Sequence, residues 1–267
     1  MFVIKIGGAA GVAPEGITAD IAAHVRAGEK LLIVHGGSAL ATELGEQLGY
    51  PPRFVTSVSG HSSRYTDRRT LEIFLMATAL LNRKLVAQLQ ALGVNAAGLS
   101  GLDGQLLLAE RKATLRIVEN GKRKILRDDY TGRIQQVNLE PLRAILDSGL
   151  TPVIAPVAIS AAGEPLNVDG DRAAAQLAAA LGAKHLLILS NVPGLLRDIA
   201  DESSSIARLP AAQLENAIEE FARGRMKRKL IGAREALQGG VTRVVLADGR
   251  TEQPVTRALK GEGTVIQ

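Results

Sequence analysis

Short apolar runs of about five residues alternate along the chain with longer segments in which apolar residues return every three or four positions. The short runs are typical of buried strands, and the longer pattern is typical of amphipathic helices. Regular alternation of the two favours a mainly parallel sheet that is covered by helices on both faces. The pattern predicts strands at 2–6, 30–34, 94–98, 151–155, 185–189 and 242–246, and helices at 14–27, 38–48, 68–92, 138–148, 170–182 and 226–238.

Length and helix-end signals refine this α/β interpretation. The chain has 267 residues with 46% hydrophobic content, so it can bury a sizeable core as one large domain or two lobes. No repeat, low-complexity tract or flexible linker is evident, which favours two lobes that share one continuous sheet. We expect Asn138 to cap the helix that it precedes and Gly93 to end the longest helix.

The composition argues against several classes of site. The chain has no cysteine, so no disulfide, thiolate metal site or cysteine nucleophile can form. His24, His35, His61 and His185 lack the spacing of metal ligands, and we expect no zinc site. No run reaches the roughly 18 apolar residues that span a bilayer. Met1 leads directly into a strand without a secretory signal, so we expect a cytoplasmic protein with no membrane partner.

The positive charge of the chain is concentrated in one segment. The formal charge is +5, and the segment from Glu110 to Arg127, with seven basic and two acidic residues, accounts for all of it. Its centre, Asn120-Gly121, is favoured in two-residue turns, so we interpret the segment as a projecting basic β-hairpin. The alternative is a solvated hairpin whose charges protect its edge from aggregation. A nucleic-acid partner is not expected, because no aromatic residue interleaves with these charges.

Two of the predicted strands end in glycine pairs. Lys5 lies in the first strand, which is followed at once by Gly7-Gly8, and the second strand is followed by His35-Gly36-Gly37. Glycine lets backbone N–H groups converge on an anion, and a neighbouring lysine adds a point charge for phosphate. The combination indicates phosphoryl transfer, whereas either pair alone could simply make a tight turn. Neither the dinucleotide fingerprint nor the P-loop pattern occurs at these positions.

Three further clusters carry polar side chains at strand or helix ends. The first, from Asn167 to Asp171, precedes an alanine-rich helix, and its last acid could cap that helix or could orient lysines beside a substrate. The second, from Ser190 to Leu195, follows a strand and is well placed to meet a nucleotide. The third, from Gly224 to Lys229, opens a helix, on which Lys229 and Lys227 lie on different faces.

The order of these motifs resembles the amino-acid kinase family over essentially the whole chain. The ordered set comprises Lys5-Ile6-Gly7-Gly8, His35-Gly36-Gly37-Ser38, Gly60 to Asp67, Asn167 to Asp171, Ser190 to Leu195, Gly224-Arg225-Met226 with Lys229, and Gly261 to Val265. The branch that it resembles most is acetylglutamate kinase. Within that branch, the segments that resemble the subgroup acting on aminoadipate or glutamate attached to the amino-group carrier protein LysW are Pro51 to Phe54, His61 to Asp67 and Gly98 to Gly104.

The resemblance implies a three-layer α/β/α sandwich with a mainly parallel open sheet, similar to carbamate kinase. It places a lobe for the acylated amino acid and the dimer contact at 1–172, and an ATP lobe at 173–267. The residue roles that it implies are catalysis for Lys5, Gly8, Asp171 and Lys229, substrate binding for Gly36, Gly37, Arg64 and Asn167, and nucleotide binding for Ser190, Asn191, Val192, Gly194, Leu195, Met226 and Lys227.

The implied reaction needs no general base, because its acceptor carboxylate is already ionised at neutral pH. By resemblance, Lys5 and Lys229 flank the transferring phosphoryl group and Asp171 orients them. Arg64 pairs with the free α-carboxylate of the substrate, and Asn167 holds its acylated amino group. Positive charge and fixed N–H groups stabilise the approach of two anions, and Mg²⁺ carried with ATP adds to them without a protein metal site.

The resemblance also implies partners and leaves alternatives open. We expect a homodimer and an acidic amino-group carrier protein, and we hypothesise that the carrier docks on Lys122, Arg123 and Lys124 of the basic hairpin. The implied product is an acyl phosphate in lysine or arginine biosynthesis. Ser38 departs from the third glycine usual in acetylglutamate kinases. One alternative is a kinase acting on free N-acetylglutamate, and another is a nucleotide-binding sensor without catalysis.

Overall fold

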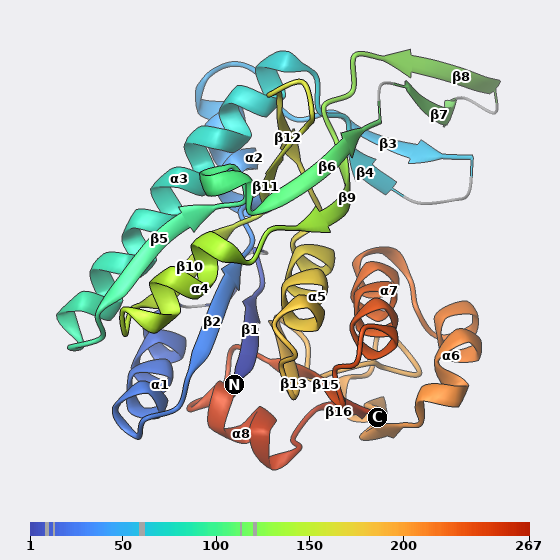
Figure 1. Cartoon of the computed structure of the whole chain (residues 1–267). Coiled ribbons are helices and arrows are strands. Elements are labelled where there is room, and N and C mark those ends of the chain that lie inside the picture. Colours follow the sequence, from blue (N-terminus) through green and yellow to red (C-terminus); the bar gives the residue numbers. More distant parts are fainter. Residues whose placement is uncertain (9–10, 13, 59–61, 113, 120–121) are drawn as a thin grey trace.

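An eight-stranded sheet forms the centre of the computed structural model, which describes all residues except 9–10, 13, 59–61, 113 and 120–121 (Figure 1). In spatial order its strands are β14 (Arg208–Leu209), β16 (Thr264–Ile266), β15 (Arg243–Asp248), β13 (His185–Ser190), β1 (Phe2–Ile6), β2 (Leu31–His35), β10 (Thr151–Ala155) and β5 (Ala96–Ser100). Neighbours pair in parallel except β15 with β16. The six predicted strands are confirmed, each starting within two residues of its expected position.

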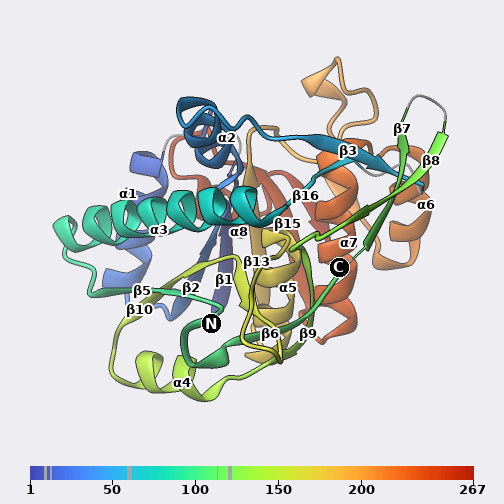
Figure 2. The same cartoon turned by 90° about the horizontal axis from the view of Figure 1, so that it is seen from above.

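Helices cover both faces of the sheet, which explains why its central strands are buried and mostly apolar. Every residue of β1, β2 and β10 is buried. One face carries α1 (Pro14–Arg26), α3 (Arg68–Ala91) and α8 (Pro254–Lys260), and the other carries α4 (Glu140–Asp147), α5 (Gly170–Ala180) and α7 (Gly224–Gln238). Figure 2 shows these layers from above. Outside them, α2 (Ser38–Gln47) packs on α3 and α6 (Leu214–Glu220) on α7. The predicted three-layer sandwich is confirmed.

Helix ends follow the sequence signals with one shift. Gly93 comes directly after the C-cap of α3 and has a φ of 79°, a left-handed conformation that glycine adopts at low cost. The fourth helix begins at Glu140 rather than at the expected position 138, with Leu139 at the N-cap. Asn138 nevertheless accepts a hydrogen bond from the backbone N–H of Glu140 at 3.3 Å. Asn138 therefore still caps the helix, although it lies one residue before the N-cap position.

Two small four-stranded sheets lie beyond the carboxyl ends of the central strands (Figure 1). The order in one is β12 (Pro165–Asn167), β11 (Val157–Ile159), β6 (Leu107–Arg111) and β9 (Gly132–Val137). The order in the other is β4 (Ser62–Arg64), β3 (Phe54–Ser57), β7 (Thr114–Glu119) and β8 (Lys122–Arg127). Short 3-10 helices are η1 (Asp103–Gln105), η2 (Glu202–Ser204) and η3 (Ala211–Gln213).

The predicted basic hairpin is present as β7 and β8. The two strands pair antiparallel and project at one corner of the molecule in Figure 1. The expected turn at Asn120-Gly121 lies outside the described residues. β7 also pairs with β3, so the hairpin belongs to a sheet. The other six strands of the small sheets were not predicted, because they have only three to six residues and most of them include polar residues, so they lack a clear apolar run.

Two expectations about the chain as a whole have different outcomes. The single continuous sheet is confirmed, because one sheet includes strands from the first and the last part of the chain. The lobe boundary between residues 172 and 173 stays a prediction, and it falls in the first turn of α5. Within the described residues, no helix combines the length and the apolar character that crossing a membrane requires.

The loops that follow β1 and β2 touch each other through glycine. A Cβ on Gly8 would lie 2.5 Å from the nitrogen of Gly37, and one on Gly36 would lie 2.5 Å from the nitrogen of Gly8. Side chains do not tolerate such contacts with backbone, so the close approach requires glycine at both positions. The loops therefore meet at the carboxyl ends of adjacent parallel strands, where open α/β sheets bind their ligands.

We expect Gly8→Ala to destabilise the protein by about 1–3 kcal/mol, the usual cost of overpacking. The new methyl group would meet backbone atoms of Gly36 and Gly37, which have no flexible end that could move away. The free energy of unfolding, measured by urea denaturation, should fall accordingly.

Gly16→Ala is the matched control for that substitution. Gly16 lies in α1, and a Cβ there would meet nothing within 4 Å. Because glycine weakens a helix interior, this change should stabilise by about 0.5–1 kcal/mol. Equal stability of the two variants would contradict the close approach of the loops.

Candidate functional site

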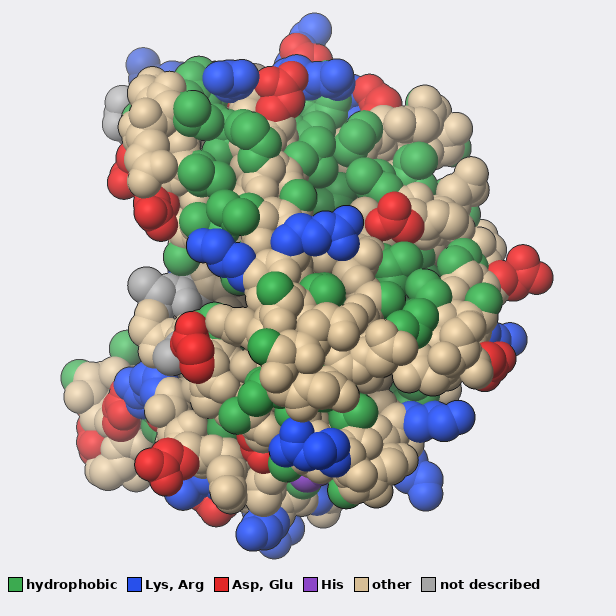
Figure 3. Space-filling model, turned by 90° about the vertical axis from the view of Figure 1, so that its left-hand side faces the viewer, with side chains coloured by type: hydrophobic (Ala, Val, Ile, Leu, Met, Phe, Trp, Pro, Cys, Tyr) green, Lys and Arg blue, Asp and Glu red, His purple; other side chains and the backbone are tan. Residues whose placement is uncertain are grey.

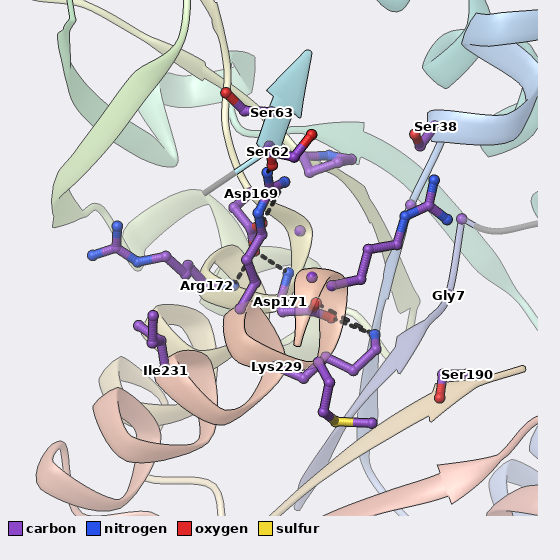
Figure 4. A pocket seen from close by; sticks show the side chains of 18 of the residues that line it. Gly7, Ser38, Ser62, Ser63, Asp169, Asp171, Arg172, Ser190, Lys229 and Ile231 are labelled. Atoms are coloured by element: carbon purple, nitrogen blue, oxygen red, sulfur yellow. Dashed lines mark hydrogen bonds and ion pairs between the residues drawn. The ribbon is translucent and has the colours of Figure 1, made fainter. Parts of the chain in front are cut away.

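A cavity of about 920 Å³ lies where the central sheet, the small sheets and the first turns of α5 and α7 meet. Its wall includes the glycine loops, the end of β13, Arg64 of β4 and Asn167 of β12. Figure 4 shows part of this wall, with Ser62 and Ser63 on one side of Asp171 and Ser190 on the other. The volume is within the range of small-molecule binding sites.

Lys5, Asp171 and Lys229 form a buried charge cluster in this cavity. The Nζ atom of Lys5 lies 2.7 Å from Oδ1 of Asp171, and Nζ of Lys229 lies 3.4 Å from both carboxylate oxygens. Burial alone would raise the pKa of Asp171, but the charges of Lys229 and Lys5 and their hydrogen bonds outweigh it and hold this pKa at about 2. An ionised carboxylate therefore separates two lysines that come from β1 and α7.

Asp169, rather than Asp171, caps α5. The Asp169 carboxylate accepts hydrogen bonds from the backbone N–H groups of Asp171 at 3.0 Å and Arg172 at 3.1 Å. The capping alternative for Asp171 is therefore wrong, and its side chain is left to face the lysines. Arg172 in turn donates to Glu235 of α7 at 2.6 Å, which holds α5 against α7.

The side chain of His35 supports the second glycine loop. Its Nδ1 lies 2.7 Å from the carbonyl oxygen of Gly36, and its Nε2 lies 3.2 Å from Nδ2 of Asn82. Because a carbonyl oxygen only accepts, Nδ1 carries the proton and Nε2 accepts from Asn82. Burial lowers the pKa of His35 to about 4, opposed by the bond to Gly36 and assisted by the charge of Lys5. His35 is therefore neutral at pH 7.

Arg64 presents a guanidinium group to the cavity. Its Nη2 donates to the carbonyl oxygen of Ser38 at 3.0 Å and to Oγ1 of Thr42 at 2.8 Å, both on α2. Burial lowers the pKa of Arg64, and so does the nearby charge of Arg225. A guanidinium fixed in this way can form paired hydrogen bonds with a carboxylate.

Most of the predicted site residues meet in the one cavity. Those on the catalytic and substrate side that line it are Lys5, Gly8, Gly36, Gly37, Arg64, Asn167, Asp171 and Lys229. Those predicted for the nucleotide that line it are Ser190, Asn191, Val192, Gly194, Leu195 and Met226. Lys227 is not among its lining residues in the described part of the chain. Gly60 and His61 of the family-like motif lie outside the described residues.

The turn after β13 is held tightly against the C-terminal strand. A Cβ on Gly194 would lie 2.5 Å from Oγ1 of Thr264, and the backbone N–H of Leu195 donates to that same oxygen at 2.8 Å. This contact ties the nucleotide-side loop to β16. The glycine at position 194 therefore has a packing reason as well as a place in the cavity wall.

The three residues predicted for carrier docking lie beside the cavity rather than in it. Lys122, Arg123 and Lys124 are exposed on β8. Lys124 pairs with Glu119 at 2.6 Å across the hairpin. The paired strand β7 contributes Leu115 to the cavity wall, so the hairpin borders the opening.

Sequence reasoning gave no role to several residues that line the cavity. Arg225 lies four residues before Lys229 and so shares its face of α7. Arg228 lies 3.8 Å from Asp169 and donates to the carbonyl oxygen of Ser62, which joins α7 to the sheet containing β4. The basic cluster that opens α7 was the available signal, but the sequence alone cannot say which of its charges face inward.

The arrangement suits phosphoryl transfer to an acceptor that is already ionised. Two lysines bridged by a carboxylate and two glycine loops can stabilise negative charge on a phosphoryl group, while His35 is neutral and occupied by its own hydrogen bonds. The fold and site are thus those of an α/β phosphotransferase.

Comparison with known proteins identifies the family. The model named "Amino acid kinase family" matches residues 1–248, and the chain belongs to this family. Kinase activity implies the use of ATP.

The [LysW]-aminoadipate kinase of Deinococcus radiodurans is 54% identical over the whole of this chain and 91% of its own length. That of Thermus thermophilus is 50% identical over the full length of both chains. The [LysW]-aminoadipate/[LysW]-glutamate kinase of Saccharolobus solfataricus is 37% identical over 100% of this chain and 99% of its own.

Solved structures confirm the fold. An N-acetylglutamate synthase from Neisseria gonorrhoeae superposes with a TM-score of 0.80 at 25% identity, covering 99% of this chain. This chain spans 58% of that longer protein. A carbamate kinase from Giardia lamblia superposes with a TM-score of 0.67 at 15% identity, over 99% of this chain and 97% of its own.

We expect Asp171→Asn to destabilise the protein by about 3 kcal/mol at neutral pH, because it leaves two buried lysines without a counter-charge. Since the pKa of Asp171 is lowered from 3.8 to about 2 on folding, the carboxylate stabilises the native state fully above about pH 4. This stabilisation should disappear as the pH falls from about 4 towards 2. Urea denaturation of both proteins across this range measures the difference.

Asp147→Asn serves as the control for loss of an acidic group. Asp147 is an exposed residue at the end of α4. Its replacement should change the free energy of unfolding by no more than about 0.5 kcal/mol. A pH-independent difference between wild type and Asp171→Asn would contradict the buried charge cluster.

Proposed function

We propose that this protein is an ATP-dependent kinase for the side-chain carboxylate of aminoadipate attached to an amino-group carrier protein, with carrier-bound glutamate as a second acceptor. The product is an acyl phosphate of lysine biosynthesis and, with glutamate, of arginine biosynthesis. The observation that carries this proposal is 54% identity over the full chain to a protein named [LysW]-aminoadipate kinase. The charge cluster and the glycine loops supply chemistry that fits it.

In the proposed reaction, a carboxylate oxygen of the acceptor attacks the γ-phosphorus of ATP. The bond from that phosphorus to the β,γ-bridging oxygen breaks, ADP leaves, and no proton moves. Lys5 and Lys229 stabilise the charge on the transferring group, and Asp171 keeps them apart and oriented. The backbone N–H groups of Gly8, Gly36 and Gly37 bind phosphate and acceptor oxygens.

The two ends of the amino acid are bound by different elements in this proposal. Arg64 holds the α-carboxylate through paired hydrogen bonds, and Asn167 holds the acylated amino group. Both residues belong to the small sheets. The reacting end of the side chain then points to the glycine loops of the central sheet.

ATP occupies the part of the cavity lined by the loop after β13 and by Met226. We place Lys227 at its border, as the family resemblance implies. Mg²⁺ arrives bound to the triphosphate as part of the substrate. This fits the residues present, because Asp171 is paired with two lysines and Asp169 with the start of α5, and Mg²⁺ is commonly held by substrate phosphates.

The basic hairpin is the proposed docking surface for an acidic carrier. Lys122, Arg123 and Lys124 are exposed next to a strand that contributes to the cavity wall. Opposite charges on two proteins raise the rate at which they associate. A carrier held at the hairpin would bring its attached amino acid to the opening.

Homodimer formation through α2 and α3 is also part of the proposal. Leu48, Tyr50, Met76 and Leu80 are exposed on or beside these helices. Figure 3 shows hydrophobic side chains gathered on this face of the molecule. Contiguous apolar surface of this kind often marks an interface.

A cytoplasmic location, with no nucleic acid or membrane as partner, stays an expectation from the sequence.

Two alternatives make different predictions. A kinase for free N-acetylglutamate would need no carrier, and the basic hairpin would only be solvated. A nucleotide sensor would need neither lysine of the charge cluster for its function. The names of the most similar relatives favour the carrier-linked substrate, and the presence of both lysines favours catalysis.

We expect ADP release with Mg-ATP to be fastest with carrier-bound aminoadipate, followed by carrier-bound glutamate, and slowest with free N-acetylglutamate. One methylene distinguishes the first two, so their kcat/KM should differ by about 10–200-fold. A coupled assay at equal acceptor concentrations measures all three. Preference for free N-acetylglutamate would support the arginine-pathway kinase, and undiminished turnover by Lys5→Ala would support the sensor.

Reversing the hairpin charges, with Lys122→Glu, Arg123→Glu and Lys124→Glu together, should raise KM for carrier-bound aminoadipate about tenfold at low salt. The KM for Mg-ATP should not change, because these residues lie outside the cavity lining. The effect should shrink above about 0.3 M salt, where charges are screened within a few ångströms.

The control replaces three exposed lysines elsewhere, Lys84, Lys184 and Lys260, with glutamate, which keeps the change in net charge the same. None of them belongs to the small sheets or to the cavity wall. If this control raises KM for the carrier-bound acid as much as the hairpin variant does, net charge rather than the hairpin guides the carrier.

A further inference from the structure

Thr66 lies between the two residues that we assign to the amino acid. It is fully buried, two positions after Arg64, and it precedes α3. Its Oγ1 donates to the carbonyl oxygen of Arg64 at 3.4 Å and accepts from Nδ2 of Asn167 at 3.0 Å. Arg64 and Asn167 belong to different small sheets, and so one hydroxyl group joins the two.

The direction of these bonds fixes the orientation of the Asn167 amide. The carbonyl oxygen of Arg64 only accepts, so it takes the single hydroxyl proton of Thr66. The hydroxyl oxygen must then accept from Asn167, which places the amide nitrogen towards Thr66. The oxygen Oδ1 of Asn167 is left as the acceptor for a donor in the cavity. An acylated amino group offers one such donor, its N–H.

Asp129 holds Thr66 in place from the other side. This carboxylate is fully buried and accepts from the backbone N–H of Thr66 at 3.1 Å and from the hydroxyl of Thr131 at 2.5 Å. The residue between them continues the connection, because the N–H of Tyr130 donates to the carbonyl oxygen of Thr66 at 2.7 Å and its own carbonyl oxygen accepts from the N–H of Asn167 at 2.9 Å. The backbone on both sides of the hydroxyl is therefore fixed.

We propose that Thr66, held by Asp129, is a positioning residue that orients the Asn167 amide and sets its place relative to Arg64, so that the two read the acylated amino group and the α-carboxylate as one unit. The proposal rests on the function proposed above for Arg64 and Asn167. Neither Thr66 nor Asp129 lines the cavity, and the hydroxyl group of Thr66 is connected to the cavity wall through Arg64 and Asn167.

Thr66→Val removes the hydroxyl and keeps the shape of the side chain. It should raise KM for carrier-bound aminoadipate about tenfold, because Asn167 loses its partner and its amide can turn over. The KM for Mg-ATP should stay within about twofold and kcat within about threefold. Thr66→Ser keeps the hydroxyl and should restore KM to within about threefold of wild type. Equal changes in both KM values would show a merely structural role and overturn the proposal.

A double-mutant cycle with Asn167→Ala separates this inference from the proposed function. If Thr66 acts through Asn167, Thr66→Val should have less than a twofold effect on KM in the Asn167→Ala background. Failure of Asn167→Ala itself to raise this KM would overturn the substrate assignment and, with it, the role of Thr66. A raised KM in Asn167→Ala with none in Thr66→Val would overturn only the role of Thr66. Should Thr66→Val not fold, Thr66→Ala and Thr66→Ser, which differ by the hydroxyl alone, make the same comparison.

Discussion

One buried carboxylate organises the site, because it is the only counter-charge that Lys5 and Lys229 share among the described residues. The two lysines come from the first strand and from α7, more than 200 residues apart in the chain. Asp171 can balance them only if its side chain is not used as a cap, and Asp169 takes over that task. The short sequence from Asp169 to Asp171 thus combines helix capping with charge placement. The ion pair of Arg172 with Glu235 then keeps α5 and α7 in register.

The glycine loops complete this control of charge. Gly8 and Gly36 approach so closely that only backbone fits between the loops that follow β1 and β2, and backbone N–H groups carry partial rather than full positive charge. His35 supports the second loop in its neutral form, since burial lowers its pKa to about 4. His35 therefore adds no full charge beside Lys5 at neutral pH.

The sequence predicts the central sheet better than the small sheets, for a physical reason. Strands buried on both faces, such as β2, read as almost continuous apolar runs. Short strands such as β4, which is entirely polar, and β12, which mixes polar and apolar residues, resemble loops. The residues of the site also differ in how well the local sequence predicts them. Lys5 stands out beside its glycines, but the roles of Thr66 and Asp129 depend on hydrogen bonds between segments about 60 residues apart. No local pattern reports such contacts.

The division between the central sheet and the small sheets bears on how the proposed enzyme would select its acceptor. In the proposed function, phosphoryl-transfer chemistry lies on the central sheet and on the helices packed against it, where Lys5, Asp171 and Lys229 form the charge cluster. In the proposed function, the amino acid is recognised by the small sheets, where Arg64 and Asn167 are joined through Thr66. A carrier-linked acid has its amino end attached to a second protein, so that end must face an opening. In the proposal this opening lies beside the small sheets, where β7 of the basic hairpin contributes to the cavity wall. Changes there can alter the acceptor while the lysine cluster stays intact.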